Sequence, residues 1–566
     1  MKYDPELPLM IQSDSTIILE AEHPEATQAA KQLSRFAELV KTPGALHTYR
    51  LSPISLWNAA ASGMGAEQIL QVLEAYSKFD LPMQTVEQVR RFVGRYGLVK
   101  LVEEDRQLKL VADDPDVLKQ LASYQSLSAY FSDSGQDGAL TVDPRFRGLL
   151  KQDLIRLGYP VKDLAGYHHG EKLPVRLREV TASGKPFSLR DYQQEAAEAF
   201  SSGDKGGSGV VVLPCGAGKT VVGIAALAKL QCAALILTTN AASVHQWKRE
   251  LLDKTDLSSD LIGEYSGDRK EVRPVTIATY QILTHRRTKD GPFAHLSLFN
   301  ERDWGLIIYD EVHLLPAPVF RATASIQATR RLGLTATLVR EDGREEDVFS
   351  LVGPKLYELG WKELEQKQWV AEVRCMEVRV PLPESLRSKY MQAGLRQKYR
   401  IAGENPGKLD VLRKLIEKHK GEQTIIIGQY LNQLKTIADQ LGAPMVYGEM
   451  PNRERDLLYD RFNRGEIRTL VVSKVANFAI DLPDAKVAIQ VSGSFGSRQE
   501  EAQRLGRILR PKADGNSAYF YSLVSDGTRE QEFSMNRQLF LAEQGYRYEI
   551  SSLMPLETAK IGGVAE

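Results

Sequence analysis

The spacing of apolar residues divides the chain into regions with different expected structure. Over residues 1 to about 120, apolar positions recur at helical spacing, which predicts a mainly helical region. One such set is Ile69, Val72, Leu73 and Tyr76. Two β-prone runs, 97–102 and 108–111, flank an acidic stretch and predict a hairpin. Helices followed by a hairpin suggest a winged-helix-like domain over 1–125, which would contact DNA or act as a protein–protein spacer.

Beyond residue 180, short apolar runs alternate with helical stretches, a pattern typical of a parallel α/β sheet. The strand candidates are 210–213, 234–237, 275–278, 306–309 and 332–334, then 424–427, 445–447, 469–472, 487–491 and 518–521. Two tandem α/β domains are therefore expected, over 181–370 and 371–550. The segment 135–180 is mixed and fits no single pattern. Residues 551–566 would form a C-terminal tail, whose last stretch, 558–566, is small and polar and is expected to fray.

Composition narrows the class of protein. The 566 residues include 43% hydrophobic residues, and 73 Lys and Arg balance 73 Asp and Glu. This is ordinary globular composition without a global positive field, so any site for nucleic acid must be local. The three cysteines are far apart, which predicts no zinc site, iron–sulfur cluster or disulfide framework and favours a reducing cytoplasm. No apolar run is long enough to predict a membrane segment or a leader.

A phosphate-binding loop is the strongest local signal. The sequence LPCGAGKT, residues 213–220, follows an apolar strand and opens a helix. Backbone N–H groups around Gly216 and Gly218 can surround phosphate oxygens, while Lys219 reaches the β- and γ-phosphates and Thr220 binds Mg²⁺. Leu213 stands where the usual pattern has its first glycine. This loop alone predicts a nucleotide site and leaves a simple kinase open.

Two further clusters extend the nucleotide site. Asp310 and Glu311 end an apolar strand, where Asp310 can hold the Mg²⁺ shell and Glu311 can polarise the attacking water. Arg507 and Arg510 share one face of a predicted helix and can stabilise charge on a γ-phosphate. The alternatives are a pair of solvated acids and a solvated basic helix. Together with the phosphate loop, the clusters favour ATP hydrolysis.

Five boxes resemble motifs Q, I, II, III and VI of superfamily 2 helicases and follow in the same order. They are Gln193 in LRDYQ, GAGKT at 216–220, DEVH at 310–313, LTAT at 334–337 and QRLGRILR at 503–510. More narrowly, LPCGAGK and the stretch LGLTATLVRED at 332–342 resemble the XPB family, and the likeness covers nearly the whole chain. The resemblance implies an α/β fold. Two tandem RecA-like motor domains would follow a mainly helical N-terminal region and a small mixed domain.

The resemblance also implies roles for single residues. Gln193 would read the adenine edge with support from Arg190, and Asp481 would lie near the ribose. The segments 135–180 and 385–400 would be a damage-recognition-like domain and a thumb-like insertion. The residues implied to contact DNA or to couple hydrolysis to it are Gln246, Trp247, Thr335, Thr337 and the RED loop Arg340, Glu341 and Asp342. The implied arginine fingers are Arg507 and Arg510.

The sequence thus predicts an ATP-dependent DNA helicase or translocase that uses Mg²⁺, with 3′–5′ polarity and a role in DNA repair implied by the family. Its partners would be single-stranded or forked DNA and, by resemblance, a nuclease or another repair protein. An alternative is an ATP-switched duplex remodeller or a scaffold that recruits a partner without processive unwinding. A restriction-type motor subunit and an RNA substrate are less favoured.

Overall fold

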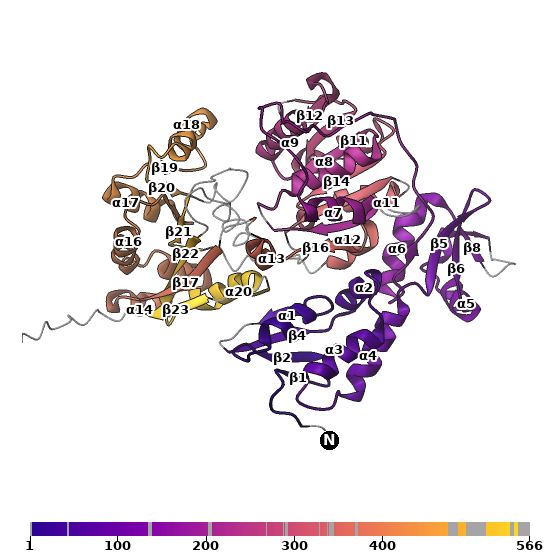
Figure 1. Cartoon of the computed structure of the whole chain (residues 1–566), viewed down its shortest axis with the longest axis horizontal. Helices are drawn as coiled ribbons and strands as arrows, with labels where there is room; N and C mark the ends of the chain where they lie inside the picture. Colours follow the sequence, from indigo (N-terminus) through magenta and orange to yellow (C-terminus); the bar gives the residue numbers. More distant parts are fainter. Residues whose placement is uncertain are drawn as a thin grey trace, which may run out of the picture. The chain divides into compact units, whose positions relative to one another are not determined.

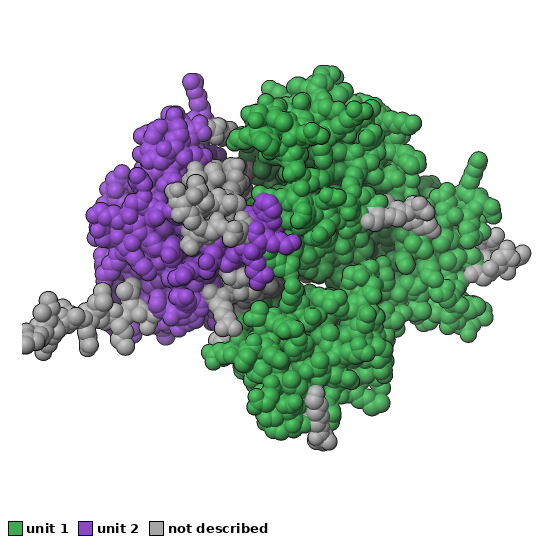
Figure 2. All heavy atoms as spheres, in the orientation of Figure 1, with its two compact units in different colours: residues 1–363 green, residues 364–566 purple. Residues whose placement is uncertain are grey.

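The computed structural model describes most of the chain, which falls into two compact units, residues 1–363 and 364–566 (Figures 1 and 2). The described ranges are 3–41, 45–133, 139–201, 207–214, 216–267, 269–286, 288, 293–327, 329–336, 338, 344–367, 369, 372–473, 485–493, 517–543 and 548–552. No helix among these residues is both long and apolar enough to span a membrane.

Unit 1 begins with an antiparallel sheet that the sequence analysis did not predict. Its order is β1 (Leu9–Ile11), β2 (Thr16–Glu20), β4 (Leu46–Arg50) and β3 (Glu38–Lys41), with α1 (Ala26–Leu33) between β2 and β3. Buried and partly exposed residues alternate along β2, so its period is two and not 3.6. The expectation of a mainly helical region is therefore wrong before residue 50. It is confirmed for the next three elements, α2 (Pro53–Ala61), α3 (Ala66–Tyr76) and α4 (Met83–Arg95).

The predicted hairpin is confirmed, but it belongs to a larger sheet. Strands β5 (Val99–Glu104) and β6 (Gln107–Ala112) pair around Asp105 and Arg106, whose positive φ angles are those of a tight hairpin turn. β6 also pairs with β8, and β5 with β9, which gives the order β7-β8-β6-β5-β9. The other strands of this sheet are β7 (Phe131–Asp133), β8 (Ala139–Val142) and β9 (Lys162–Asp163). The helices of this region are α5 (Pro115–Ser123) and α6 (Arg147–Arg156). The C-terminal part of the predicted domain 1–125, from Val99 onward, thus shares one sheet and one core with the segment 135–180.

The rest of unit 1 is a seven-stranded parallel sheet. Its order is β12 (Ile262–Tyr265), β13 (Val275–Thr279), β11 (Ala234–Thr238), β14 (Leu306–Asp310), β15 (Arg330–Thr335), β10 (Ser208–Val212) and β16 (Lys355–Glu358). All five predicted strands are present, and β12 and β16 were not predicted. The helices are α7 (Asp191–Ser201), α8 (Lys219–Leu230), α9 (Ala241–Lys254), α10 (Tyr280–Leu283), α11 (Ala317–Ser325), α12 (Glu345–Leu351) and α13 (Trp361–Gln366).

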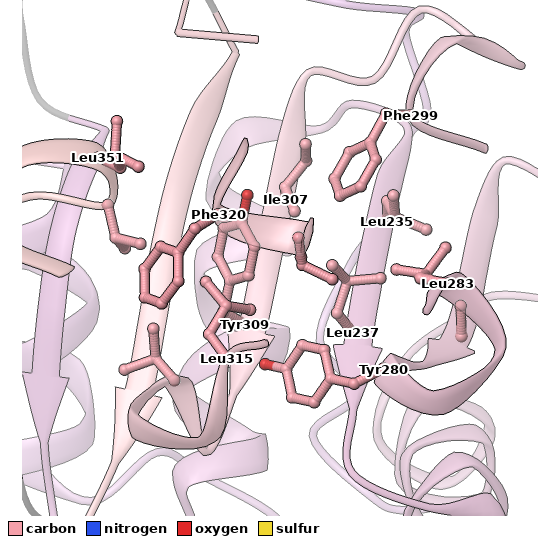
Figure 3. Packing of buried hydrophobic residues seen from close by; sticks show 14 of the residues in the cluster. Leu235, Leu237, Tyr280, Leu283, Phe299, Ile307, Tyr309, Leu315, Phe320 and Leu351 are labelled. Atoms are coloured by element: carbon pink, nitrogen blue, oxygen red, sulfur yellow. The ribbon is translucent and has the colours of Figure 1, made fainter. Parts of the chain in front are cut away.

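The strands of this parallel sheet are rich in apolar residues, which fits a sheet covered on both faces. Every residue of β11 and of β13 is buried, as expected for a sheet packed between helices. Figure 3 shows the core on one face, where Leu237 and Ile307 from the strands meet Tyr280, Leu315 and Phe320. This core supports the sheet edge at which β10 and β14 end.

Unit 2 contains a second seven-stranded parallel sheet. Its order is β19 (Met445–Val446), β20 (Thr469–Val472), β18 (Thr424–Ile427), β21 (Val487–Gln490), β22 (Ser517–Asp526), β17 (Glu372–Pro381) and β23 (Tyr548–Ser552). The helices are α14 (Glu384–Gln392), α15 (Leu395–Gly403), α16 (Gly407–Lys418), α17 (Leu431–Leu441), α18 (Asn452–Asn463) and α20 (Glu530–Glu543). The two sheets confirm the expected pair of RecA-like domains. The basic segment 385–400 forms two helices, α14 and α15.

A buried charged cluster ties the mixed segment to the motor sheet of unit 1. Asp163 accepts hydrogen bonds from Arg147 at 2.7 and 3.1 Å and from Lys151 at 3.0 Å. Lys151 also donates to Gln327 at 2.9 Å, just after α11. Burial lowers the pKa of Lys151 to about 8, although the nearby Asp163 carboxylate acts to raise it. The two cations hold the pKa of the Asp163 carboxyl well below its usual value although burial alone would raise it. This cluster fixes α6 against the motor domain.

We expect Asp163→Asn to lower the free energy of unfolding of unit 1 by about 3–5 kcal/mol, because it leaves two buried cations without their counterion. Urea unfolding followed by tryptophan fluorescence measures this, since four of the five tryptophans lie in unit 1. Asp116→Asn is the matched control, because its ion pair with Lys119 is exposed on both sides. Equal unfolding curves for Asp163→Asn and the control would show that the cluster does not stabilise this junction.

Candidate nucleotide and metal site

The phosphate loop lies between the end of β10 and the start of α8. Gly216 and Gly218 have φ angles of +83° and +79°, in the left-handed region that favours glycine. α8 begins at Lys219, so its free N–H groups and positive dipole end face the loop. Leu213 is buried, and its N–H donates to the carbonyl of Thr335 at 2.9 Å. This position therefore continues the strand pairing, which explains why a leucine fits where the usual pattern has glycine.

Sheet register brings the loop, the acids and the motif III threonine to one edge. β10 pairs with β15 so that Val212 lies opposite Thr335, and β14 pairs with β15 so that Asp310 lies opposite Leu334. All three strands are parallel and end at this edge, which is where α/β sheets bind ligands.

Lys219 and Glu311 form an ion pair at this edge. The Lys219 Nζ lies 3.3 Å from Glu311 Oε1, and both side chains are largely buried. Glu311 has a φ of +51°, which is unusual for a residue with a side chain and marks a strained position. His313 Nδ1 lies 3.5 Å from Glu311 Oε2, and a 2.6 Å hydrogen bond joins His313 to Thr335 Oγ1. His313 of motif II thus bonds to the motif III threonine and lies beside the Glu311 carboxylate.

The two adjacent acids have opposite pKa shifts. Burial raises the pKa of Asp310 to about 6, and the neighbouring charge of Glu311 adds to this effect. Burial would also raise the pKa of Glu311, but the cationic Lys219 and the nearby His313 outweigh it and hold the pKa below its ordinary value. Glu311 is therefore ionised at neutral pH, as a group that polarises water must be.

Asp310 is held by two residues whose part in this site the sequence analysis missed. The indole N–H of Trp247 donates to Asp310 Oδ2 at 2.8 Å, and the hydroxyl of Tyr280 donates to the Asp310 backbone carbonyl at 2.8 Å. Trp247 had been expected to contact the DNA backbone. That expectation needs correction, because the side chain is only 1% exposed and faces the acid. Gln246 precedes it on α9 and is half-buried. No local signal identifies Tyr280, which reaches Asp310 from 30 residues away.

The residues of the Q motif hold the phosphate loop in this structure. Gln193 is buried, and its Nε2 donates to the carbonyl of Ala217 at 3.0 Å. The hydroxyl of Tyr192 donates to the same carbonyl at 2.8 Å, and Arg190 donates to that hydroxyl at 3.0 Å. The backbone N–H of Arg190 also donates to Gln193 Oε1 at 3.1 Å. Gln193 is thus placed beside the loop, with both ends of its amide engaged.

Thr220 and Asp310 offer a hydroxyl and a carboxylate oxygen, which are ligands that Mg²⁺ accepts. Among the described residues, no group of three or more His, Cys, Asp and Glu side chains is arranged to hold a metal. Mg²⁺ usually binds through one or two protein oxygens, the substrate phosphates and water, so this sparse donor set fits it. Several predicted site residues lie outside the described residues. They are Thr337, Arg340, Glu341, Asp342, Asp481, Arg507 and Arg510.

A phosphate loop and paired acids on one RecA-like sheet, followed by a second such sheet, define a nucleotide-driven motor of the helicase type. The family model described as ERCC3/RAD25/XPB C-terminal helicase matches residues 364–560. A type III restriction enzyme res subunit model matches 186–340, and a helicase conserved C-terminal domain model matches 9–132.

The similar proteins identify the family. A Kineococcus radiotolerans protein named DNA 3′-5′ helicase XPB is 53% identical over 96% of this chain and 96% of its own length. A protein of the same name from Mycobacterium tuberculosis is 52% identical over 96% and 97% of the two chains. The general transcription and DNA repair factor IIH helicase/translocase subunit XPB of Encephalitozoon cuniculi is 35% identical over 97% and 83%. The chain belongs to the XPB family of helicases.

Proposed function

We propose that this protein is an ATP-dependent DNA helicase that translocates with 3′–5′ polarity. The observation that carries the proposal is the group of Lys219, Glu311 and Asp310 beside the phosphate loop. The proposal is also supported by the similarity of the whole chain, which is more than half identical to two proteins named DNA 3′-5′ helicase XPB. The same site would also serve a duplex remodeller that opens DNA locally without processive unwinding.

The chemistry follows from the ion pair. In the structure Lys219 neutralises Glu311, and a triphosphate in the loop would offer Lys219 a stronger anionic partner. Glu311 would then be free to orient and polarise a water molecule near the γ-phosphate. Mg²⁺, bound with ATP through Thr220 and Asp310, would neutralise charge that develops on the phosphates. The phosphate charge would therefore be neutralised by Lys219 and Mg²⁺ only when ATP is bound.

Other roles are proposed from the sequence and its resemblance. Arg507 and Arg510 would be arginine fingers, Asp481 would lie near the ribose, and Gln193 would read adenine after nucleotide displaces its bond to Ala217. Gln246 would contact the backbone of the DNA strand, and Thr335 and Thr337 would link hydrolysis to the DNA track. The overall charge balance implies that basic residues gather locally along the DNA, since no global field attracts it.

We also propose a cellular setting. The resemblance supports a role in DNA repair, with single-stranded or forked DNA as substrate and a nuclease or another repair protein as partner. The three widely separated cysteines support a reducing cytoplasm. Two of them, Cys232 and Cys375, are buried free thiols.

Strand displacement tests the proposed polarity. Duplexes with a 3′ or a 5′ single-stranded tail are incubated with the protein, ATP and Mg²⁺, and strand release is measured. We expect release from the 3′-tailed duplex and little from the 5′-tailed one. ATP hydrolysis stimulated by DNA, but without release from either duplex, would favour the remodeller instead. Release only from the 5′-tailed duplex would contradict the proposed polarity.

Alanine at Arg340 should separate unwinding from hydrolysis. The RED loop is proposed to act on DNA, so we expect strand release to fall about tenfold, equivalent to ~1.4 kcal/mol in the barrier, with little change in ATP turnover. Parallel assays of release and hydrolysis measure both effects. Arg464→Ala removes an exposed arginine of unit 2 and serves as the control. Equal losses of both activities for Arg340→Ala would argue against a dedicated unwinding role.

A further inference from the structure

We infer that Trp247 is a positioning residue that orients the Asp310 carboxylate for Mg²⁺ and sets its spacing from the helix that carries Thr220. The inference rests on the proposed ATPase, because it concerns the same metal site. It assigns Trp247 a place inside unit 1 and not on the DNA surface. Its basis is the contact of one indole ring with both elements that supply the proposed metal ligands.

The first contact is the hydrogen bond to the acid. Trp247 lies on α9 with 1% of its surface exposed, and its Nε1 is 2.8 Å from Asp310 Oδ2. A buried indole N–H needs an acceptor, and a backbone carbonyl usually suffices. Trp304 shows that ordinary case, since its Nε1 donates to the Leu298 carbonyl at 2.9 Å. A bond to a carboxylate is stronger and fixes the rotation of that group.

These contacts determine which oxygen of the Asp310 carboxylate is available to a metal ion. One carboxylate oxygen is engaged by the indole, and the backbone carbonyl of the same residue accepts from Tyr280 at 2.8 Å. The remaining oxygen, Oδ1, is then the ligand atom presented to an incoming ion. Partners of this kind, which touch a ligand and not the metal, set ligand orientation and metal affinity.

The second contact is with the helix that follows the phosphate loop. A Cβ atom built on Gly223 would lie 2.6 Å from the Cη2 atom of Trp247, so the ring packs directly against the α8 backbone. Gly223 lies one turn beyond Lys219 and three residues beyond Thr220. The indole therefore contacts the backbone of α8 while it holds the acid of β14.

The experiment compares Trp247→Phe with Trp304→Phe in the full-length protein. Phenylalanine keeps an aromatic ring but removes the N–H, and both variants lose one buried hydrogen bond in the same unit. The probe is a fluorescent ADP analogue, whose dissociation constant is measured in EDTA and at increasing Mg²⁺ concentration. This separates nucleotide binding from the contribution of the ion and needs no turnover.

For Trp247→Phe we expect unchanged ADP affinity in EDTA. The Mg²⁺ concentration that gives half of the Mg²⁺-dependent gain in ADP affinity should rise about tenfold, the usual loss of metal affinity when a partner of a metal ligand is removed. Trp304→Phe should match the wild-type protein in both conditions. Wild-type Mg²⁺ dependence in Trp247→Phe, or equal losses in both variants, would overturn the inference. Absence of nucleotide binding by the wild-type protein would instead contradict the proposed function itself.

Gly223→Ala provides a second variant that leaves the indole intact. Alanine favours a helix over glycine, so the backbone effect of the change is stabilising. The added methyl group must displace the Trp247 ring, and we expect the same selective loss of Mg²⁺ dependence. A folded Gly223→Ala protein with wild-type Mg²⁺ dependence would overturn the proposed spacing role even if Trp247→Phe is too unstable to purify.

Discussion

Lys219→Ala should reduce ATP turnover at least about 100-fold, the loss typical when one preorganised donor to a developing charge is removed. The structure places Lys219 at the start of α8 and 3.3 Å from Glu311, beside the glycines of the phosphate loop. Alanine removes the cation that would meet the β- and γ-phosphates. It also removes the charge that holds the pKa of Glu311 low. Steady-state hydrolysis with saturating DNA measures the combined effect.

Lys229→Ala is the matched control for this change. Lys229 lies near the other end of the same helix and is partly exposed. Its Nζ lies 3.4 Å from Glu198 Oε1. Its turnover should equal that of the wild-type protein. A folded Lys219→Ala protein that hydrolyses ATP at the wild-type rate would contradict the assignment of the phosphate loop.

Glu311→Gln should bind ATP nearly as well as the wild-type protein but hydrolyse it about 10²–10⁴-fold more slowly, the range of general-base contributions. Glutamine has almost the same shape, so the contacts with Lys219 and His313 can persist in part. Its amide is neutral and is not a base, whereas Glu311 is kept ionised by Lys219. Nucleotide binding and single-turnover hydrolysis, measured on the same preparation, separate the two effects.

Glu301→Gln is a control for the loss of one negative charge, because Glu301 is an exposed residue of unit 1. It should leave both binding and hydrolysis unchanged. Unchanged hydrolysis in Glu311→Gln would move the base role to another residue. Loss of ATP binding in Glu311→Gln would instead indicate that the carboxylate is needed to shape the loop.

The parallel sheets were predictable because their signals are local. Runs such as 234–237 and 425–427 are continuously apolar, and each lies in a strand buried on both faces. Asp310 ends such a strand and Glu311 follows it directly, so their place at a sheet edge could be inferred without the structure. The short antiparallel strands before residue 50 were missed, because three to five residues give little periodic signal beside helical neighbours.

The contacts that complete the site were not predictable because they join distant segments. Trp247 is 63 residues from Asp310 in the sequence, and its motif Ia position favoured a DNA contact over a buried bond to the acid. Tyr280 meets Asp310 across 30 residues, and His313 meets Thr335 across 22. The direction in which each side chain points depends on how the helices pack on the sheet, which residue spacing alone does not define.

ATP hydrolysis measured with no nucleic acid, with single-stranded DNA, with duplex DNA and with RNA is the most direct test of a DNA-driven motor. Lys219→Ala provides the blank. We expect low basal turnover, strong stimulation by DNA and weak stimulation by RNA. The form of DNA that stimulates most distinguishes an unwinding helicase from a duplex translocase. Turnover that is the same under all four conditions would show that DNA does not drive the ATPase cycle.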